Sequence, residues 1–223
     1  AGGFDANMTK NRAFFAARGI IPASTGVAID IGAGCGFAAI PLAEAGFRVT
    51  AVDFCLPLTE ELRCHATSPV EIIAGDILDF PCWAGRTPEL ITCTGDTLTH
   101  LPDTGAVRDL LLQCHDELVP GGKLVLSLRD YSGEPEGGIT VIPVRRDEDR
   151  IFLCRLEYRK NWVRVMDILY SRQSGRWQRD LGTYTKIRIA VGHLRKELEV
   201  AGFLVEECRA EQGVITAIAV RKS

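Results

Sequence analysis

The most constraining feature of this chain is a glycine-rich turn with the sequence DIGAGCG, which runs from Asp30 to Gly36. It lies between a β-branched apolar run at 27–30 and a helix-like stretch at 37–46. Because glycine adopts backbone angles that a side chain forbids, such a turn lets the backbone approach a ligand closely. The start of the following helix adds unpaired N–H donors. This order of elements predicts an α/β domain with a ligand-binding site at the turn.

The first half of the chain alternates short apolar runs with helix-like stretches, which predicts a parallel sheet with right-handed crossovers. The expected strands are 27–30, 48–53, 70–76, 88–94 and 123–130, and the expected helices are 37–46, 58–66 and 103–119. The end of the chain predicts a helix at 193–203 and strands at 204–209 and 214–222.

The stretch between 133 and 190 follows a different pattern. A turn-rich break at 133–138 precedes apolar and aromatic runs at 139–144, 150–158, 162–171 and 177–189, separated by short polar segments. These runs predict an antiparallel meander. We therefore expect one domain over 1–223, with a core at 27–132 and 191–223 and an inserted meander at 139–190.

Composition narrows the class of protein. The net charge of −3 and the pI near 5.9 argue against a generally basic nucleic-acid-binding surface. No apolar run approaches the roughly 18 to 20 residues that cross a bilayer, and the first residues lack the apolar stretch of a signal peptide. The start at Ala1 rather than Met is consistent with a longer natural N-terminus. The eight cysteines show neither C-x-x-C nor zinc-binding spacing, so we expect a cytoplasmic protein with reduced thiols, no disulfide, no metal and no membrane partner.

An acidic residue at the end of the second expected strand completes the pattern. Asp53 follows Gly36 by 17 residues, and its carboxylate can accept hydrogen bonds from both hydroxyls of a ribose. That arrangement alone fits a dinucleotide as well as another adenosine ligand. The glycines, however, run G-x-G-x-G rather than G-x-G-x-x-G, and Asp30 before them would repel a pyrophosphate but attract a cation. The charges favour S-adenosylmethionine, which carries a sulfonium and an ammonium but no phosphate.

Four segments, in this order, resemble the class I S-adenosylmethionine-dependent methyltransferases. VAIDIGAGCG looks like the first motif of the family, Asp53 like its ribose-binding acid, AGDILDF (74–80) like its adenine-contacting segment and VPGGKLVLS (119–127) like its turn into strand five. The resemblance implies a seven-stranded Rossmann-like α/β sheet flanked by helices, with the last strand antiparallel, and S-adenosyl-L-methionine as cofactor. The cofactor-binding residues that it implies are Asp30, Gly32, Gly34, Gly36, Asp53, Phe54, Asp76, Ile77 and Thr94. Alternatively, Asp76 is a turn former and Ile77 a core residue.

A narrower resemblance concerns the segments TGDTLTHLPD (94–103) and LRDYS (128–132), which are similar to the glycine and sarcosine N-methyltransferases. It implies that Arg129 contacts a carboxylate of the acceptor. His100 follows the fourth expected strand, where methyl donor and acceptor would meet, and could accept a proton, while Tyr131 and Tyr184 could line the acceptor pocket. The chain departs from that subfamily at Asp96, where the subfamily has Asn, and at Leu128, where it has His. Alternatively, Arg129 forms an ion pair with a nearby acid such as Asp130, His100 has a structural role, and Tyr131 is a half-buried residue of the sheet.

Together the patterns predict in-line methyl transfer to a small-molecule acceptor, either an amine or a hydroxyl compound that can carry a carboxylate. The inserted meander is expected to cover that acceptor, and its exposed edge would allow a homodimer. One alternative is a nucleic-acid or protein methyltransferase, although TGDT stands where base-amino methyltransferases have an N-P-P-Y-like motif. Another is a non-catalytic module that binds the cofactor. The stretch at 7–20 would form either a lid over the cofactor or a helix packed on the sheet edge.

Overall fold

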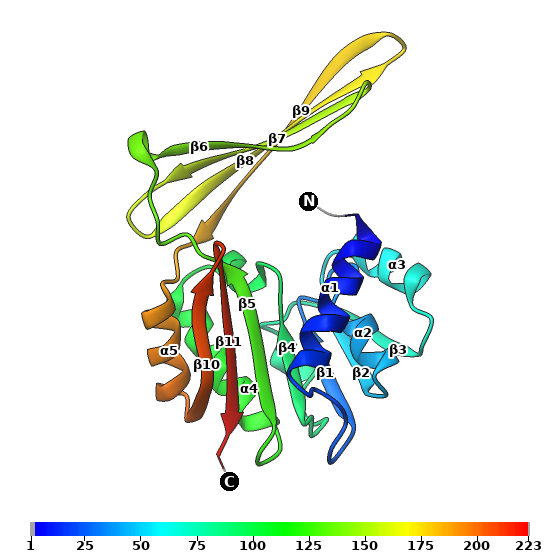
Figure 1. The fold of residues 1–223 in the computed structure, drawn as a ribbon, viewed down its shortest axis with the longest axis vertical. Helices are drawn as coiled ribbons and strands as arrows, with labels where there is room; N and C mark the ends of the chain where they lie inside the picture. Colours follow the sequence, from blue (N-terminus) through cyan, green and yellow to red (C-terminus); the bar gives the residue numbers. More distant parts are fainter. Residues whose placement is uncertain (1–2, 223) are drawn as a thin grey trace.

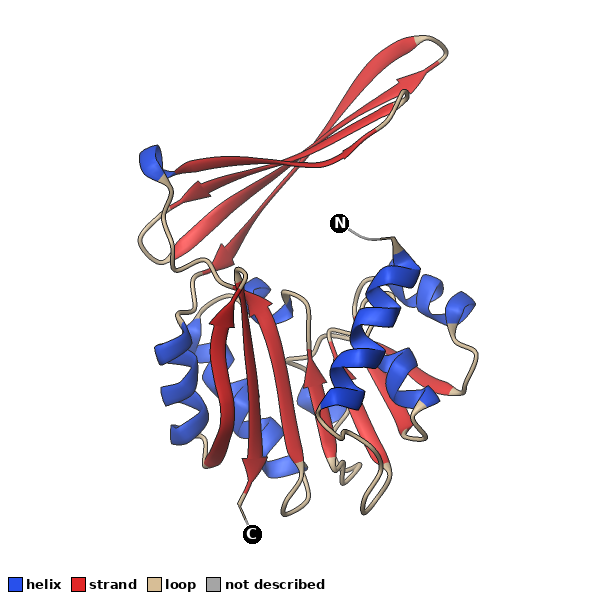
Figure 2. Ribbon diagram, in the orientation of Figure 1, coloured by secondary structure: helices blue, strands red, loops and turns tan. Residues whose placement is uncertain are grey.

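The computed structural model describes residues 3–222. A seven-stranded sheet with helices on both faces forms the core, and a separate four-stranded sheet projects from one end of it (Figures 1 and 2). No helix in this part of the chain combines the length and the apolar character that crossing a lipid bilayer requires.

The large sheet has the strand order β10-β11-β5-β4-β1-β2-β3. Its strands are β1 (Val27–Ile31), β2 (Arg48–Asp53), β3 (Val70–Ala74), β4 (Leu90–Cys93), β5 (Lys123–Arg129), β10 (Phe203–Glu211) and β11 (Val214–Arg221). β1 to β5 pair in parallel, whereas β11 runs antiparallel to both β5 and β10. This confirms the predicted sheet with an antiparallel last strand. The chain builds outward from β1 to β3 and then returns to β4, so the strand order reverses between β1 and β4.

Helices cover the two faces of the sheet in separate groups. On one face lie α1 (Phe4–Ala17), α2 (Ala39–Glu44) and α3 (Leu56–His65), and on the other α4 (Thr104–Glu117) and α5 (Val191–Val200). α2 is shorter than its predicted range because the residues before Ala39 are still part of the turn. α4 begins where predicted, since the carboxylate of Asp103 accepts the N–H of Ala106 at 2.9 Å and caps the helix. Short 3-10 turns occur at η1 (Phe80–Cys82), η2 (Thr97–His100) and η3 (Glu136–Gly138).

The first helix, α1, packs across α2, on the face of the sheet that α2 and α3 cover. Met8 and Phe15 are buried in the core on this face. The ring of Phe4 stacks on His65, with 3.9 Å between the ring centroids. α1 is thus held by packing along its whole length.

The inserted residues form an antiparallel sheet of four consecutive strands, as predicted. These are β6 (Ile139–Arg146), β7 (Arg150–Tyr158), β8 (Trp162–Gln173) and β9 (Arg176–Ile187). Arg188 anchors the inserted sheet to the core, because its guanidinium donates to the carbonyls of Tyr131 at 2.9 Å and Ser132 at 3.0 Å. Figure 1 shows the inserted sheet beyond the carboxyl end of β5.

Candidate functional site

The glycine-rich turn after β1 is packed tightly against two neighbouring elements. Gly32 and Gly36 have φ values of 71° and 91°, a region that favours glycine. A Cβ on Gly32 would collide with the side chain of Thr97, and one on Gly36 with Leu62. These two glycines therefore let η2 and α3 approach the turn. Gly34, at φ 53°, has no such close neighbour.

Asp53 joins the glycine-rich turn to the start of α3. Its Oδ2 accepts the N–H of Gly34 at 2.8 Å, and its Oδ1 accepts the N–H of Cys55 at 2.8 Å. Each carboxylate oxygen keeps a further lone pair that a ribose hydroxyl can use. The next residue, Phe54, is 75% exposed, so its ring offers an uncovered apolar surface beside the carboxylate. This pairing of a fixed acid and a bare aromatic ring fits an adenosine.

The predicted adenine-contacting residues lie at the end of β3. Asp76 is exposed, and its Oδ1 accepts the N–H of Leu78 at 2.9 Å, which closes a local turn. Ile77 is buried in the core, and its carbonyl accepts the indole N–H of Trp83 at 3.0 Å. Asp76 is therefore both a turn former and accessible, whereas the side chain of Ile77 packs in the core. Thr94, after β4, is half-buried, and its carbonyl accepts the Thr97 hydroxyl at 3.3 Å.

Asp30 is buried directly before the glycine-rich turn. Its Oδ1 accepts the hydroxyl of Thr92 at 2.6 Å, while its Oδ2 has no hydrogen-bond partner among residues 3–222. Desolvation raises the pKa of Asp30 from 3.8 to about 7. A cation bound near this acid would favour its ionised form. An acid with an unsatisfied oxygen at this place fits a cationic cofactor.

Asp96, which follows β4, connects three elements. Its Oδ1 accepts the N–H of Arg129 at 2.8 Å, and its Oδ2 accepts the Tyr131 hydroxyl at 3.2 Å and the Lys186 ammonium at 2.5 Å. Lys186 lies on β9 and is buried. The sequence marked Asp96 only as a departure from a subfamily, and Lys186 was missed altogether. Asp suits this position better than the Asn of the resembling subfamily, because the Asp96 carboxylate neutralises the buried Lys186 ammonium.

A cavity of about 310 Å³ lies between the inserted sheet and the end of β5. It is lined by Arg129, Tyr131, Ile142, Pro143, Val144, Phe152, Cys154, Leu156, Val165, Asp167, Tyr184 and Lys186. The cavity thus brings the predicted residues Arg129 and Tyr131 together with residues of all four inserted strands. No local pattern marked Asp167 as a site residue, since it is one acid among several alternating charges on the meander.

The guanidinium of Arg129 forms no hydrogen bond or ion pair with another residue in 3–222. The alternative of an ion pair with Asp130 is therefore not realised, and the carboxylate of Asp130 instead accepts the N–H of Ser132 at 2.8 Å. Tyr131 is 1% exposed, and burial together with the adjacent Asp96 charge raises its pKa far above its usual value. Tyr131 is therefore a neutral wall residue, while Arg129 presents a free cation to the cavity.

His100 lies at the end of η2, beside the cavity. Its ring stacks on Tyr184 with 5.3 Å between centroids and an interplanar angle of 27°. Desolvation and then the nearby Lys186 ammonium lower the pKa of His100 below its usual 6.5. The imidazole is consequently neutral at pH 7 and can accept a proton.

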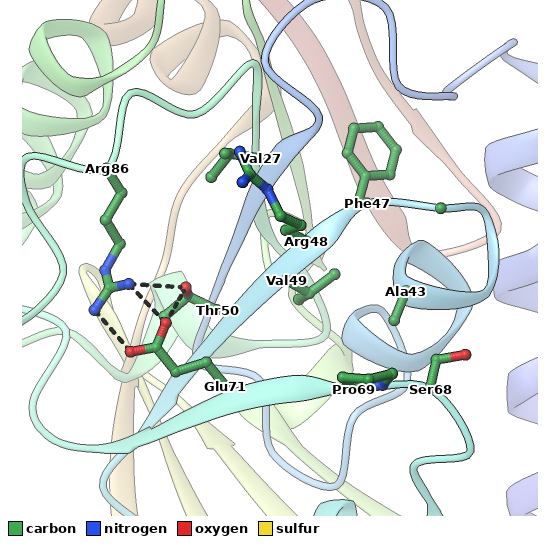
Figure 3. Close-up of a pocket in the computed structure, with 11 residues that line it drawn as sticks. Val27, Ala43, Phe47, Arg48, Val49, Thr50, Ser68, Pro69, Glu71 and Arg86 are labelled. Carbon is green, nitrogen blue, oxygen red and sulfur yellow. Dashed lines mark hydrogen bonds and ion pairs between the residues drawn. The ribbon is translucent and has the colours of Figure 1, made fainter.

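A larger cavity of about 590 Å³ lies elsewhere, at the amino-terminal ends of β1, β2 and β3 (Figure 3). Arg86 binds Glu71 there through two hydrogen bonds of 2.6 and 2.9 Å, so the two charges neutralise each other. Ligands of open α/β sheets bind outside the carboxyl ends of the strands. The smaller cavity, at that end, is therefore the candidate site. Within 3–222, no cluster of three or more His, Cys, Asp or Glu side chains could hold a metal ion.

Comparisons with known proteins agree with this geometry. The sequence model of a family described as "Methyltransferase domain" matches residues 28–122. A glycine/sarcosine N-methyltransferase from Halorhodospira halochloris is 28% identical over 109 residues, which span 47% of this chain and 40% of that protein.

Solved structures match the chain over nearly its whole length. The CcbJ methyltransferase from Streptomyces caelestis has a TM-score of 0.81 and 20% identity, and the match covers 100% of this chain and 97% of that one. The amino pentose methyltransferase CalS10 from Micromonospora echinaspora, solved with S-adenosylmethionine bound, has a TM-score of 0.78 and 18% identity, with 100% and 92% covered. At these identities the structures establish the fold. Residues 28–122 thus match a methyltransferase domain, and the chain as a whole has the fold of these methyltransferase structures.

Proposed function

We propose that this protein transfers the methyl group of S-adenosylmethionine to the nitrogen of a small amine bound under the inserted sheet. The proposal depends on the position of the segment from Thr94 to His100. This segment borders both the glycine-rich turn, where the cofactor would bind, and the cavity under the inserted sheet, where the acceptor would bind. Thr97 packs over Gly32 in the cofactor-binding turn, and Asp96 hydrogen-bonds residues that line the 310 Å³ cavity. A cofactor at the turn and an acceptor in the cavity would therefore lie next to each other.

The cofactor side of the site would be formed by Asp53, Phe54, Asp76 and the unsatisfied acid Asp30. Bound S-adenosylmethionine supplies an electrophilic methyl group on a sulfonium. The chain fixes the Asp53 carboxylate with two backbone donors, so that little ordering remains to be done when a ribose binds. A cation bound beside Asp30, whose pKa is raised to about 7, would favour the ionised form of this acid.

The acceptor side has to deliver a neutral nucleophile in line with the methyl group. A cavity bordered by the inserted sheet can fix the direction of approach, and such positioning supplies roughly 7 to 11 kcal/mol at its upper end. His100, neutral at pH 7, is placed to take the proton that an ammonium must lose before it can attack. The free Arg129 guanidinium would hold an acceptor carboxylate.

Two relatives favour an amine over a hydroxyl compound. One is named a glycine/sarcosine N-methyltransferase and the other an amino pentose methyltransferase, so both names refer to amine-bearing molecules. The small volume of the cavity favours a metabolite over a nucleic acid or a protein. The net charge of −3 supports the same choice.

The test uses cofactor labelled on its transferable methyl group. The protein is incubated with cell extract, and the products are separated into small metabolites, nucleic acid and protein. We expect label in small metabolites that bear an amine, and much less label when Asp53→Ala replaces the wild-type protein at the same subsaturating cofactor concentration. Label in nucleic acid or protein would overturn the acceptor class. Binding of the cofactor without any transfer would indicate a non-catalytic binding module.

A further inference from the structure

The cavity wall contains one negative charge that no ion pair neutralises. Asp167 on β8 forms no ion pair with another residue in 3–222. Lys186, by contrast, is already paired with Asp96. Burial, followed by the charge and the hydrogen bond of Asp167, raises the pKa of both Tyr184 and Cys154, so its hydrogen-bonding neighbours are neutral donors. Neither neighbour therefore supplies a positive charge to this carboxylate.

The strand opposite leaves this carboxylate open. Asp167 pairs with Gly182 on β9, and cross-strand partners point to the same face of a sheet. Gly182 has no side chain to cover Asp167, and a Cβ there would lie 3.9 Å from the Asp167 Cβ. The space above the carboxylate is thus free for a ligand group.

The surroundings of Asp167 are apolar on the side of β6 and β7. Ile142, Val144, Phe152 and Leu156 of these two strands line the same cavity. A carboxylate beside an apolar wall is expensive to desolvate unless a cation binds to it. The combination is complementary to a cationic head on an apolar body.

We propose that the inner face of the inserted sheet is a subsite for an apolar amine, whose ammonium Asp167 binds and whose hydrocarbon body lies on the β6–β7 wall. This inference rests on the proposed function. A glycine-sized acceptor would leave most of the 310 Å³ cavity unfilled. The subsite therefore selects a larger molecule than the glycine or sarcosine in the name of the Halorhodospira halochloris relative.

The subsite connects to the reaction through Tyr184. Its hydroxyl is a neighbour of Asp167 and its ring stacks on His100, so Tyr184 lies between the proposed nitrogen site and the proton acceptor. The ammonium gives one proton to the imidazole of His100. The nitrogen lone pair then forms the N–C bond while the C–S bond breaks and leaves its electron pair on sulfur. The product is a methylated ammonium, which Asp167 can still bind.

Binding to the protein saturated with S-adenosylhomocysteine tests the subsite by titration calorimetry. The probes are leucinamide, its deamino analogue 4-methylpentanamide, and glycinamide. We expect leucinamide to bind about tenfold more tightly than either analogue, because one lacks the ammonium and the other lacks the apolar body. Equal affinities for leucinamide and 4-methylpentanamide would overturn the role of Asp167. Equal affinities for leucinamide and glycinamide would overturn the apolar wall.

Variants assign the effect to the residue. Asp167→Asn should weaken leucinamide about tenfold and leave 4-methylpentanamide unchanged, whereas Asp109→Asn on the exposed face of α4 should change neither. Gly182→Val retains the carboxylate but covers it, so it should also weaken leucinamide. If Asp167→Asn retains the wild-type affinity, the proposal fails. If S-adenosylhomocysteine itself does not bind, the proposed function fails instead, and the two failures are distinct.

Discussion

At the scale of single residues, two acids at the carboxyl ends of β1 and β2 have opposite environments. Asp53 is fixed by two backbone donors, whereas Asp30 is buried with one oxygen unsatisfied. Hydrogen bonds from N–H groups favour a carboxylate, and desolvation disfavours it. We therefore expect Asp53 to bind the ribose by accepting hydrogen bonds, and Asp30 to become ionised when a cation binds beside it.

Replacing Asp53 with Ala should weaken cofactor binding at least about tenfold, because two charge-assisted hydrogen bonds to the ribose are lost. Titration calorimetry with S-adenosylhomocysteine measures this loss. Asp109→Ala on α4 is the control and should leave the affinity unchanged. If the Asp53→Ala protein binds as tightly as the wild type, the carboxylate does not contact the ribose.

Asp30 makes stability depend on pH. Its pKa is raised from 3.8 to about 7 in the folded protein, so between these values the folded state holds a proton that the unfolded state has lost. Stability therefore falls as the pH rises through this window and is constant above it. The Asp30→Asn variant has no such pH-dependent loss of stability. The melting temperature of the variant minus that of the wild type should therefore be larger at pH 8 than at pH 5. An equal difference at both values would argue against a raised pKa.

Arg129→Lys should impair use of a carboxylated acceptor more than it impairs cofactor binding. A lysine keeps the charge but cannot reproduce the two parallel hydrogen bonds of a guanidinium. Steady-state kinetics with the acceptor identified by the labelling experiment gives KM for both substrates. Equal increases in the two KM values would contradict a carboxylate contact.

At the scale of elements, the Asp96–Lys186 pair ties the segment after β4 to β9. The pair is partly desolvated, with 20% and 8% of the two side chains exposed. Removing one partner leaves the other charge unpaired in the wall of the cavity. The pair therefore matters for the position of the inserted sheet as well as for stability.

Lys186→Met should lower the free energy of unfolding by about 3 kcal/mol, because the Asp96 carboxylate loses its cation. The double variant Asp96→Asn with Lys186→Met should lose less than the sum of the two single variants, since neither charge is then left alone. Urea denaturation followed by circular dichroism measures all three. Additive losses would show that the two side chains do not interact.

At the scale of the whole molecule, the inserted sheet ends on an exposed edge strand. Residues 176–185 of β9 are all exposed, and they include Trp177 and Leu181. A long open edge with apolar side chains invites pairing with another strand. Antiparallel pairing of two copies centred on Gln178 would set Arg176 opposite Asp180 of the second copy, which favours a homodimer.

Light scattering should accordingly give the mass of two chains for the wild-type protein. Leu181→Lys places a charge on the edge and should shift the mass to that of one chain, without altering the circular dichroism spectrum. A wild-type protein that is monomeric at its highest soluble concentration would exclude this edge as a dimer contact.

The sequence alone determined the architecture and the residues of the proposed cofactor half of the site. The alternation of apolar runs with helices, the glycine-rich turn, Asp53 and the meander were all predicted, because each depends on neighbours within a few residues. Arg129 was predicted as well, since it lies in a segment that resembles a known subfamily.

The acceptor half of the site was decided by the tertiary structure. Lys186 meets Asp96 across 90 residues of sequence, and Asp167 faces the cavity because β8 pairs with β9 in one register. Ile77 packs in the core, and the Arg129 guanidinium has no ion-pair partner within residues 3–222, for the same kind of reason. Burial and charge pairing depend on which strands the crossovers bring together, and no local pattern records that.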